Sequence, residues 1–320
     1  MPILQKGIIA MSIIDVNALT KDYGSGRGVF DVSFHVNQGE VFGFLGPNGA
    51  GKSTTIRHLM GFSKSDKGST CIFGKETFHR YNEILGRVGY IPGEVALPAG
   101  LTGWEFLHMM QQMQGNKNEE LLRQLIKTFE LDPAGETKRM SLGVKRKLAV
   151  VSAFMNDPDV LILDEPTSGL DPVMQEVFID YIKNEKKRGK TILLSSHIFT
   201  EVDATCDRIA IIKDGKIVSD FVADDLRHAT RKSFRISFHD TEELVRFCSA
   251  VVEADQITLL GKDLAAKSVC VAVDDSNIND LIVLLNRFCV CGFTHLKETL
   301  EDYFMKYYKE EKDFGGAFKK

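Results

Sequence analysis

The chain has 320 residues, of which 43% are hydrophobic and 26% charged, and its formal net charge is −4 at pH 7. These values are typical of a soluble globular protein that is long enough for one large and one small domain. They exclude the strong basicity of a nucleic-acid-binding protein, so we expect no nucleic-acid partner.

No stretch approaches the ~18–20 consecutive apolar residues that a membrane-spanning helix needs, so we do not expect the chain to cross a membrane by itself. Residues 1–10 contain one lysine and a short apolar patch but no signal-peptide core. We expect either that Met11 is the natural start or that residues 1–10 are an extension with little role.

The six cysteines form no C-x-x-C pair and lie beside no histidine cluster. This pattern predicts buried thiols in a reducing compartment rather than disulfides or zinc ligands. The residues are Cys71, Cys206, Cys248, Cys270, Cys289 and Cys291.

The first elements alternate apolar and polar residues, which predicts an antiparallel β part over residues 12–16 and 29–36. A turn-forming segment, Tyr23–Gly28, separates them. The ring of Tyr23 either stacks on an adenine base or closes the hairpin, and the sequence leaves both interpretations open.

A glycine-rich loop, GPNGAGKST, lies between the apolar strand 40–45 and the helical segment 55–60. Its glycines allow backbone conformations that direct several N–H groups at one phosphate, and the helix N-terminus adds a positive dipole end. This context predicts a P-loop rather than a turn that matches by chance. The nucleotide-binding residues are Gly46, Pro47, Asn48, Gly49, Ala50, Gly51, Lys52, Ser53 and Thr54.

Three residues of this loop have distinct predicted roles. Lys52 would reach the β- and γ-phosphates, the Ser53 hydroxyl would bind Mg²⁺, and Thr54 would contact the α-phosphate.

Strands are also predicted at 68–73 and 87–91, and helical spacing follows from Leu101 to Phe129. We interpret residues 101–155 as a helical insertion, with Thr102 as an N-cap and Gly115 as a stop. The large apolar residues of its first helix are predicted to fill the core of the insertion, although an adaptable surface for a partner helix is the alternative. They are Trp104, Met109, Met110 and Met113.

Two apolar strands, 160–163 and 191–196, each deliver polar residues at their carboxyl ends, where open parallel sheets bind ligands. A carboxylate pair after a buried strand is costly unless a cation or a proton-transfer role stabilises it. Asp164 fits a magnesium site through water, and Glu165 fits a base that polarises attacking water. His197 at the same sheet edge is positioned to touch a γ-phosphate, the alternative being a structural histidine.

Four motifs follow one another along the chain. They are the GPNGAGKST loop (Walker A), MSLGV at 140–144, LILDEPTSGLD at 161–171 (Walker B) and SSH ending at His197. In this order, over roughly residues 13–222, they resemble the nucleotide-binding subunit of an ATP-binding-cassette (ABC) transporter. The resemblance implies an α/β P-loop NTPase fold, bound ATP and Mg²⁺, and a Mg-dependent ATPase in which Lys52, Glu165 and His197 act catalytically.

In that family two subunits pair head to tail, so the resemblance implies an ATP-dependent homodimer or heterodimer. Ser141 and Gly143 would contact the γ-phosphate held by the other subunit, Asp171 would line the dimer seam, and Tyr23 would stack on adenine. It also implies an integral membrane permease as partner and a cytoplasmic, peripheral location on the inner face of the cell membrane.

Two positions depart from the family pattern. Leu142 replaces the first glycine of the signature segment (residues 140–144), and Gly93 stands where the family has a metal-facing glutamine. Either the following Glu94 swings toward Mg²⁺ or a water molecule takes the place of the missing amide.

The segment 229–310 has the order strand, helix, strand, strand, helix, strand, which suggests a small ferredoxin-like α+β domain. It follows an ATP-binding domain at 11–228 and precedes a loose tail at 311–320. Its run LEDYFMKYY at 300–308 is similar to the end of drug- and antibiotic-export-type subunits, and we interpret this domain as dimer-supporting or regulatory.

The leading hypothesis is therefore an ATP-hydrolysing subunit that energises export of a drug, antibiotic, lipid or peptide through a separate membrane subunit. A soluble ABC ATPase acting in translation or DNA maintenance is the alternative, but the chain has one cassette, no coiled-coil arm and no basic stripe. A non-catalytic nucleotide-binding regulator is a third possibility, against which the retained Lys52, Asp164, Glu165 and His197 argue.

Overall fold

The computed structural model describes residues 11–115, 118–227, 231–254, 256–296 and 299–309. The chain divides into two compact units, one ending at Ala223 and the other beginning at Asp224. The extension predicted at 1–10, the tail at 311–320 and the domain boundary at 228–229 lie outside the described residues.

The first unit is built on a six-stranded sheet with the order β10-β9-β3-β8-β7-β6. All neighbouring strands run parallel except β10, which pairs antiparallel with β9. The central strands β3, β7 and β8 are buried along their whole length, as expected of parallel strands covered on both faces. The strands are β3 (Val41–Leu45), β6 (Val88–Ile91), β7 (Val160–Asp164), β8 (Thr191–Ser196), β9 (Arg208–Lys213) and β10 (Lys216–Val222).

A smaller antiparallel sheet has the order β2-β1-β4-β5, which confirms the predicted antiparallel β part. Its strands are β1 (Ser12–Asp22), β2 (Gly28–Asn37), β4 (Lys67–Ile72) and β5 (Lys75–Glu76). Phe34 of this sheet stacks on Phe42 with ring centroids 5.0 Å apart and lies 5.3 Å from Phe44. These rings join the two sheets in one hydrophobic core, to which Ile56 and Leu59 of α1 also belong.

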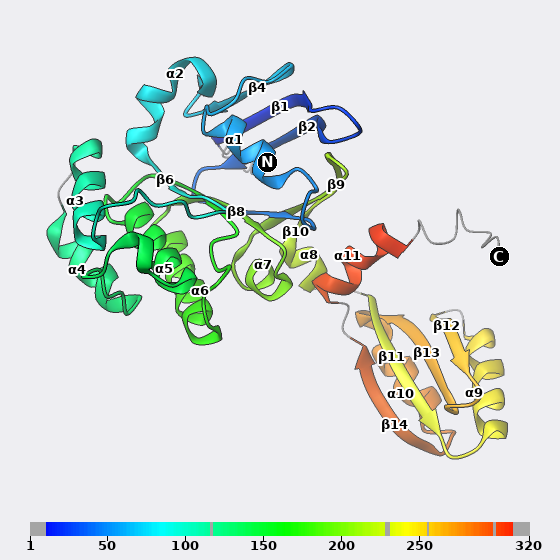
Figure 1. The fold of residues 1–320 in the computed structure, drawn as a ribbon. Coiled ribbons are helices and arrows are strands. Elements are labelled where there is room, and N and C mark those ends of the chain that lie inside the picture. Colours follow the sequence, from blue (N-terminus) through cyan, green and yellow to red (C-terminus); the bar gives the residue numbers. More distant parts are fainter. Residues whose placement is uncertain (1–10, 116–117, 228–230, 255, 297–298, 310–320) are drawn as a thin grey trace, which may run out of the picture. The chain divides into compact units, whose positions relative to one another are not determined.

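The helices of this unit connect strands of the sheets, and Figure 1 shows α3, α4, α5 and α6 grouped on one side of it. The α-helices are α1 (Lys52–Leu59), α2 (Thr77–Ile84), α3 (Gly103–Gln114), α4 (Glu119–Thr128), α5 (Leu142–Phe154), α6 (Pro172–Lys187) and α7 (Phe199–Thr205). Short 3-10 helices lie at η1 (Leu85–Arg87) and η2 (Thr137–Arg139), and α8 (Ala223–Arg227) is at the boundary of the two units. None of the described helices is long and apolar enough to span a membrane.

The helical insertion forms as predicted. Thr102 and Glu105 make a capping box at the start of α3, and Gly115 ends the helix in the left-handed conformation. The prediction about its core was wrong, because Trp104 is 38% exposed and Met113 75% exposed.

Helical periodicity explains the difference. The buried face of α3 carries Phe106 and Leu107, which are buried together with Leu122 and Leu125 of α4. Trp104 is two positions before Phe106 and three before Leu107, so it lies at the edge of that face, and Met109 and Met110 are only partly buried.

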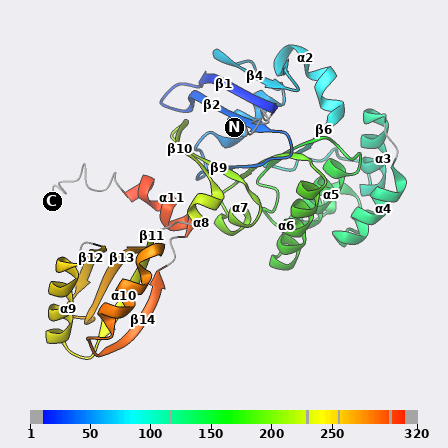
Figure 2. The same cartoon turned by 180° about the vertical axis from the view of Figure 1, so that it is seen from behind.

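The second unit contains a four-stranded antiparallel sheet with the order β12-β13-β11-β14. Its strands are β11 (Arg231–Phe238), β12 (Ile257–Asp263), β13 (Ser268–Asp274) and β14 (Val290–Leu296), and its helices are α9 (Thr241–Glu253), α10 (Ile278–Leu285) and α11 (Leu300–Lys309), with η3 (Asp275–Asn277) before α10. Buried residues of α9 and α10 share one core with the sheet, so both helices cover the same face, as Figure 2 shows from behind. This arrangement agrees with the predicted ferredoxin-like domain.

Two details of this unit concern its C-terminal end and its cysteines. From its pattern we also expect a last helix over residues 296–308, but the helix begins at Leu300, because Leu296 is the end of β14 and pairs with Ser233. Cys289 and Cys291 are exposed, so the prediction of buried thiols holds for Cys206 and Cys248 but not for this pair.

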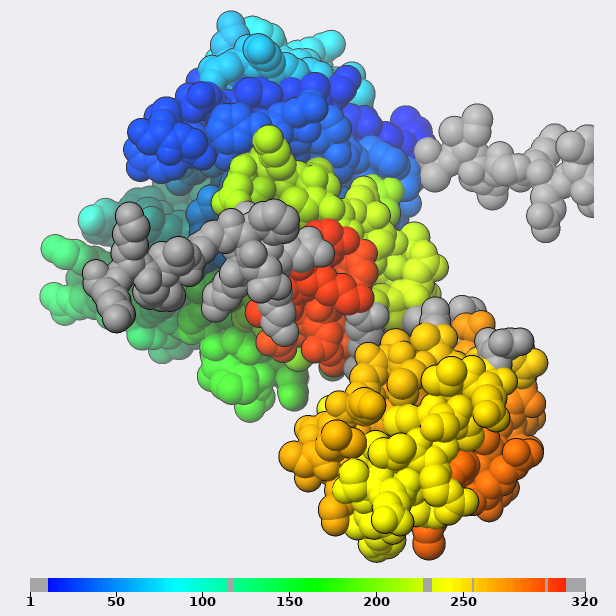
Figure 3. All heavy atoms as spheres, turned by 90° about the vertical axis from the view of Figure 1, so that its right-hand side faces the viewer, coloured from blue at the N-terminus to red at the C-terminus, as the bar shows by residue number. Residues whose placement is uncertain are grey.

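Figure 3 looks onto the side of the unit formed by α9, whose atoms are yellow.

Candidate active site

The P-loop connects β3 to α1 in the place that the sequence predicts. Gly51 is the N-cap of α1 and has a φ of 113°, which is left-handed and favours glycine. A side chain there would also clash, because a Cβ on Gly51 would lie 2.8 Å from Cγ1 of Val29. The loop therefore needs glycine at this position in order to approach the antiparallel sheet.

Lys52 links this loop to the end of β7. Its Nζ donates to the backbone oxygen of Gly46 at 2.6 Å and to that of Pro47 at 3.2 Å, and it lies 3.0 Å from Oε1 of Glu165. The side chain is only 5% exposed, so the ammonium group is held within the concave side of the loop. The predicted phosphate-binding and catalytic residues are thus in direct contact.

Asp164 and Glu165 follow one another at the carboxyl end of β7 but point in different directions. Asp164 is 2% exposed, and its Oδ1 accepts a hydrogen bond from the Ser195 hydroxyl at 2.5 Å. Glu165 has a φ of 49°, an uncommon conformation for a residue with a side chain. Backbone strain of this kind clusters at functional sites. Here the left-handed conformation of Glu165 ends the extended backbone of β7 directly after Asp164.

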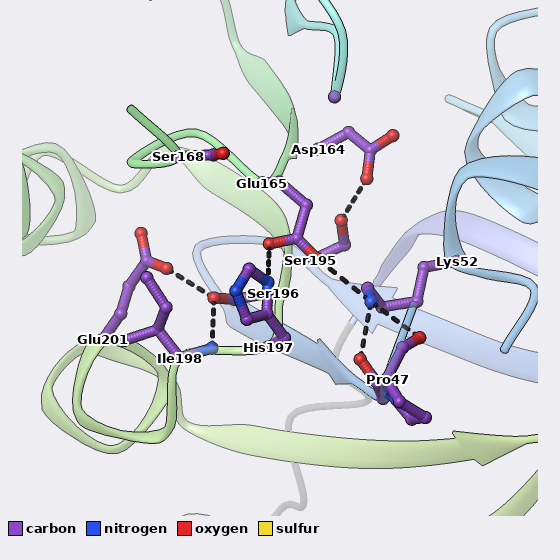
Figure 4. Close-up of polar contacts among 12 residues, drawn as sticks. Pro47, Lys52, Asp164, Glu165, Ser168, Ser195, Ser196, His197, Ile198 and Glu201 are labelled. Carbon is purple, nitrogen blue, oxygen red and sulfur yellow. Dashed lines mark hydrogen bonds and ion pairs between the residues drawn. The ribbon is translucent and has the colours of Figure 1, made fainter. Parts of the chain in front are cut away.

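His197 follows β8 and completes the cluster. Its Nδ1 is 2.5 Å from Oε2 of Glu165, so the glutamate lies between an ammonium group and an imidazole (Figure 4). The structure therefore brings Lys52, Glu165 and His197 together, as the sequence predicts.

A cavity of about 640 Å³ is open beside this cluster. Its lining includes Ser53, Glu94 and Asp164, the three predicted metal ligands, as well as Glu165 and His197. Hydroxyl and carboxylate oxygens are the ligands that Mg²⁺ prefers, and it usually takes only one or two carboxylates when phosphates supply the rest. The donor set therefore fits Mg²⁺ only together with phosphate oxygens, because no three histidine, cysteine or acidic side chains of the described residues are placed to hold a metal ion by themselves.

The loop after β6 explains how the chain accommodates Gly93 in place of glutamine. A Cβ on Gly93 would lie 2.9 Å from Oδ2 of Asp164, so any side chain there would require either the loop or the Asp164 carboxylate to shift. Glu94 is exposed and faces the same cavity. Its role as a metal ligand stays a prediction.

Asn48 of the P-loop also lines this cavity, whereas Ser141, Gly143, Asp171 and Tyr23 do not. Ser141 is the N-cap of α5, where its hydroxyl accepts from the N–H of Val144 at 3.3 Å. Asp171 is the N-cap of α6, and Tyr23 is 51% exposed in the turn between β1 and β2. Gly143 directly follows Leu142 in the first turn of α5.

Burial raises the pKa of two acidic groups, Tyr90 and Glu201, near the cluster of Lys52, Glu165 and His197. Burial raises the pKa of Tyr90 to about 12, and the nearby Asp164 carboxylate adds to the rise. Burial also raises the pKa of Glu201 on α7 to about 7, and hydrogen bonds from Ser196 and Thr167 offset this rise only in part.

Sequence reasoning missed three residues of the site. Ser195 orients Asp164, Glu201 accepts a hydrogen bond from the Ser196 hydroxyl at 2.6 Å, and Arg146 binds three backbone oxygens. The two serines stand in the SSH motif and were available as a signal. Arg146 comes just before the apolar run Leu148–Phe154. Its position beside a buried helix face is the one sequence feature that could have pointed to it.

The fold and this site define a P-loop nucleotide-binding protein. A family model described as "ABC transporter" matches residues 29–168. The bacitracin transport ATP-binding protein BcrA of Bacillus licheniformis is 34% identical over 300 residues, which are 92% of this chain and 97% of that protein. The chain therefore belongs to the ABC transporter family, as an ATP-binding subunit.

Further comparisons agree with this family. The Nod factor export ATP-binding protein I of Burkholderia pseudomallei is 36% identical over 217 residues, which are 66% of this chain and 71% of that protein. A solved ATP-binding subunit of an ABC transporter is 31% identical, has a TM-score of 0.62 and covers 68% of this chain and 92% of its own. A dimeric ATP-binding cassette bound to ADP and Pi has the same fold, with 22% identity, a TM-score of 0.60, and coverage of 66% of this chain and 99% of its own.

Proposed function

We propose that the protein hydrolyses ATP with Mg²⁺ and thereby powers export through a separate integral membrane permease. One observation carries the ATPase proposal: Glu165 lies between the Lys52 ammonium at 3.0 Å and the His197 imidazole at 2.5 Å, beside a cavity that Ser53 and Asp164 also line. The family and the names of two relatives, a bacitracin transport protein and a Nod factor export protein, support the transport role.

Each residue of the cluster has a chemical role in this proposal. Lys52 would bind the β- and γ-phosphates as a point charge, and Glu165 would accept a proton from the attacking water. His197 would orient the Glu165 carboxylate and contact the γ-phosphate. Ser53 and, through water, Asp164 would hold Mg²⁺, with Glu94 as the further ligand. When bound, the metal would supply positive charge that offsets the negative charge of the phosphates.

We infer that a second cassette completes the nucleotide site, in a homodimer or heterodimer. Ser141 and Gly143 do not line the cavity that Ser53 and Glu165 line, although the family resemblance assigns both to the γ-phosphate. A contact from the other subunit accounts for this separation, with Asp171 at the seam and Tyr23 on the adenine. The permease partner would hold the pair on the inner face of the cell membrane.

The test uses the purified full chain and its Glu165→Gln variant. We expect the variant to keep ATP binding, to lose at least about 100-fold in hydrolysis because the base is absent, and to accumulate as an ATP-bound dimer in size-exclusion chromatography. Unchanged steady-state turnover would reject Glu165 as the base. Recovery of the chain with ribosomes or DNA, rather than with a polytopic membrane protein, would reject the transport role.

A further inference from the structure

Arg146 lies in the second turn of α5 and is only 2% exposed. Its guanidinium donates to three backbone oxygens: Nη1 to Pro92 at 2.8 Å, Nη2 to Gly93 at 2.7 Å and Nε to Ser168 at 2.9 Å. The first two oxygens belong to the loop after β6, and the third belongs to the turn after Glu165. One side chain thus holds both loops beside the cavity.

Burying such a cation is energetically unfavourable. Removing a guanidinium from water costs several kcal/mol unless hydrogen bonds and opposite charges offset the loss. Burial lowers the pKa of Arg146, and the carboxylates of Asp164 and Glu165 oppose that change, so the acidic pair of the site offsets part of the cost of burying the charge. An apolar side chain would fill the same position without this cost, which argues for a role beyond packing.

A second contact connects the same helix to the same turn. A Cβ on Gly169 would lie 2.9 Å from Cγ of Leu142, so the leucine side chain lies against the glycine backbone. Leu142 is the residue that departs from the family signature, and Gly169 is the neighbour of Ser168. The start of α5 therefore contacts the turn at Ser168 and Gly169 in two ways, through the apolar side chain of Leu142 and through the hydrogen bond from Arg146.

We propose that Arg146 is a positioning residue for ATP hydrolysis, which ties the signature helix α5 to both loops that flank Asp164 and Glu165. The inference rests on the proposed ATPase function. A shift of α5 would move the loop that carries Glu94 and the turn that carries Ser168. In the proposed dimer, the signature segment of one cassette contacts the nucleotide that the other cassette holds. A shift of α5 on this contact would pass through Arg146 to the loops beside Asp164 and Glu165 in the cassette to which that α5 belongs.

The first measurement does not depend on hydrolysis. The N–H of Ser168 donates to Glu165 and that of Leu170 donates to Thr167, so their exchange with deuterium reports on the turn. In nucleotide-free Arg146→Met we expect exchange at these amides to rise by about 10-fold, because the turn loses its guanidinium contact. The matched control is Arg139→Met, since Arg139 is a highly exposed cation that pairs with Glu136 at 3.2 Å and is not among the groups that bind the two loops. Unchanged exchange in Arg146→Met would overturn the proposal.

The second measurement is the kinetics of the dimer. For Arg146→Met we expect kcat to fall by about 10-fold while the Kd for ATP changes by less than about 2-fold, because the P-loop is untouched. The Hill coefficient for ATP should fall toward 1, and Arg146→Lys should have an intermediate kcat. Equal losses of kcat and ATP affinity would mean a merely structural role and would overturn the proposal.

Two further comparisons cover a variant that does not fold and a wild-type protein that does not hydrolyse ATP. If Arg146→Met does not fold, Arg146→Lys decides by the same exchange and kinetic criteria, since it keeps the charge but cannot reach all three oxygens. A wild-type protein that binds ATP but does not hydrolyse it would reject the proposed function, whereas the exchange result would still decide the role of Arg146.

Discussion

Glu201 offers a prediction whose magnitude follows from its surroundings. The carboxyl group is buried and next to Glu165, and its pKa rises from 4.5 to about 7. Because one pKa unit corresponds to about 1.4 kcal/mol, ionising this group in the folded protein costs about 3 kcal/mol more than in the unfolded chain. For an acid with a raised pKa, the proton-linked stabilisation is fully present below pH 4.5 and is lost as the pH rises through 7.

The Glu201→Gln variant removes this ionisation and keeps an oxygen that can accept from the Ser196 hydroxyl. We expect the variant and the wild type to differ by less than about 1 kcal/mol at pH 5, and the variant to be more stable by about 3 kcal/mol at pH 8. For a unit of this size the difference corresponds to a shift of about 1 M in the urea midpoint.

Urea unfolding can be followed by the fluorescence of Trp104, the single tryptophan of the chain, which lies in the first unit. The control is Glu176→Gln, because Glu176 is exposed on α6 and should give no pH-dependent difference. A stability difference for Glu201→Gln that is the same at pH 5 and pH 8 would refute the reasoning. So would a less stable variant at pH 8.

Two further substitutions test the nucleotide site. Lys52→Ala should weaken ATP binding itself by at least about 10-fold, measured by equilibrium titration, because it removes a charge-assisted contact to phosphate; an unchanged Kd would contradict the role of Lys52. Glu94→Ala should lower coupled transport in membrane vesicles more than ATP affinity, because Glu94 faces the cavity and we propose that it substitutes for the missing glutamine; equal loss of both, or loss of neither, would count against it.

The sequence predicted that the residues of the central site lie at one edge of the sheet, because each of them stands at the end of an apolar strand. Strands β3, β7 and β8 are consecutive neighbours in a parallel sheet, so the groups that follow them, the P-loop, Asp164 and His197, must share one edge. The apolar patterns and the glycine-rich motif predicted this shared edge, whereas the order of the strands comes from the structure.

Arg146 could not be predicted in the same way. The segment Arg139–Lys147 is rich in cations and looks like a solvated helix start, yet Arg146 is buried because oxygens of Pro92 and Ser168 lie against it. These acceptors are 54 and 22 residues away along the chain, and backbone oxygens carry no residue-type signal. The burial of Trp104 was predicted wrongly for a related reason, since size and apolarity alone do not reveal which side of a helix faces its neighbour.

The exposed thiols of Cys289 and Cys291 differ from the partly or fully buried ones elsewhere in the described chain. A maleimide dye should therefore react first in the second unit, while the lone indole of Trp104 provides an optical donor in the first. Energy transfer between the two labels could follow the separation of the units through a catalytic cycle without any engineered cysteine. The same two sulfur atoms would also be the first to oxidise in air, so handling the protein under reductant is a practical requirement.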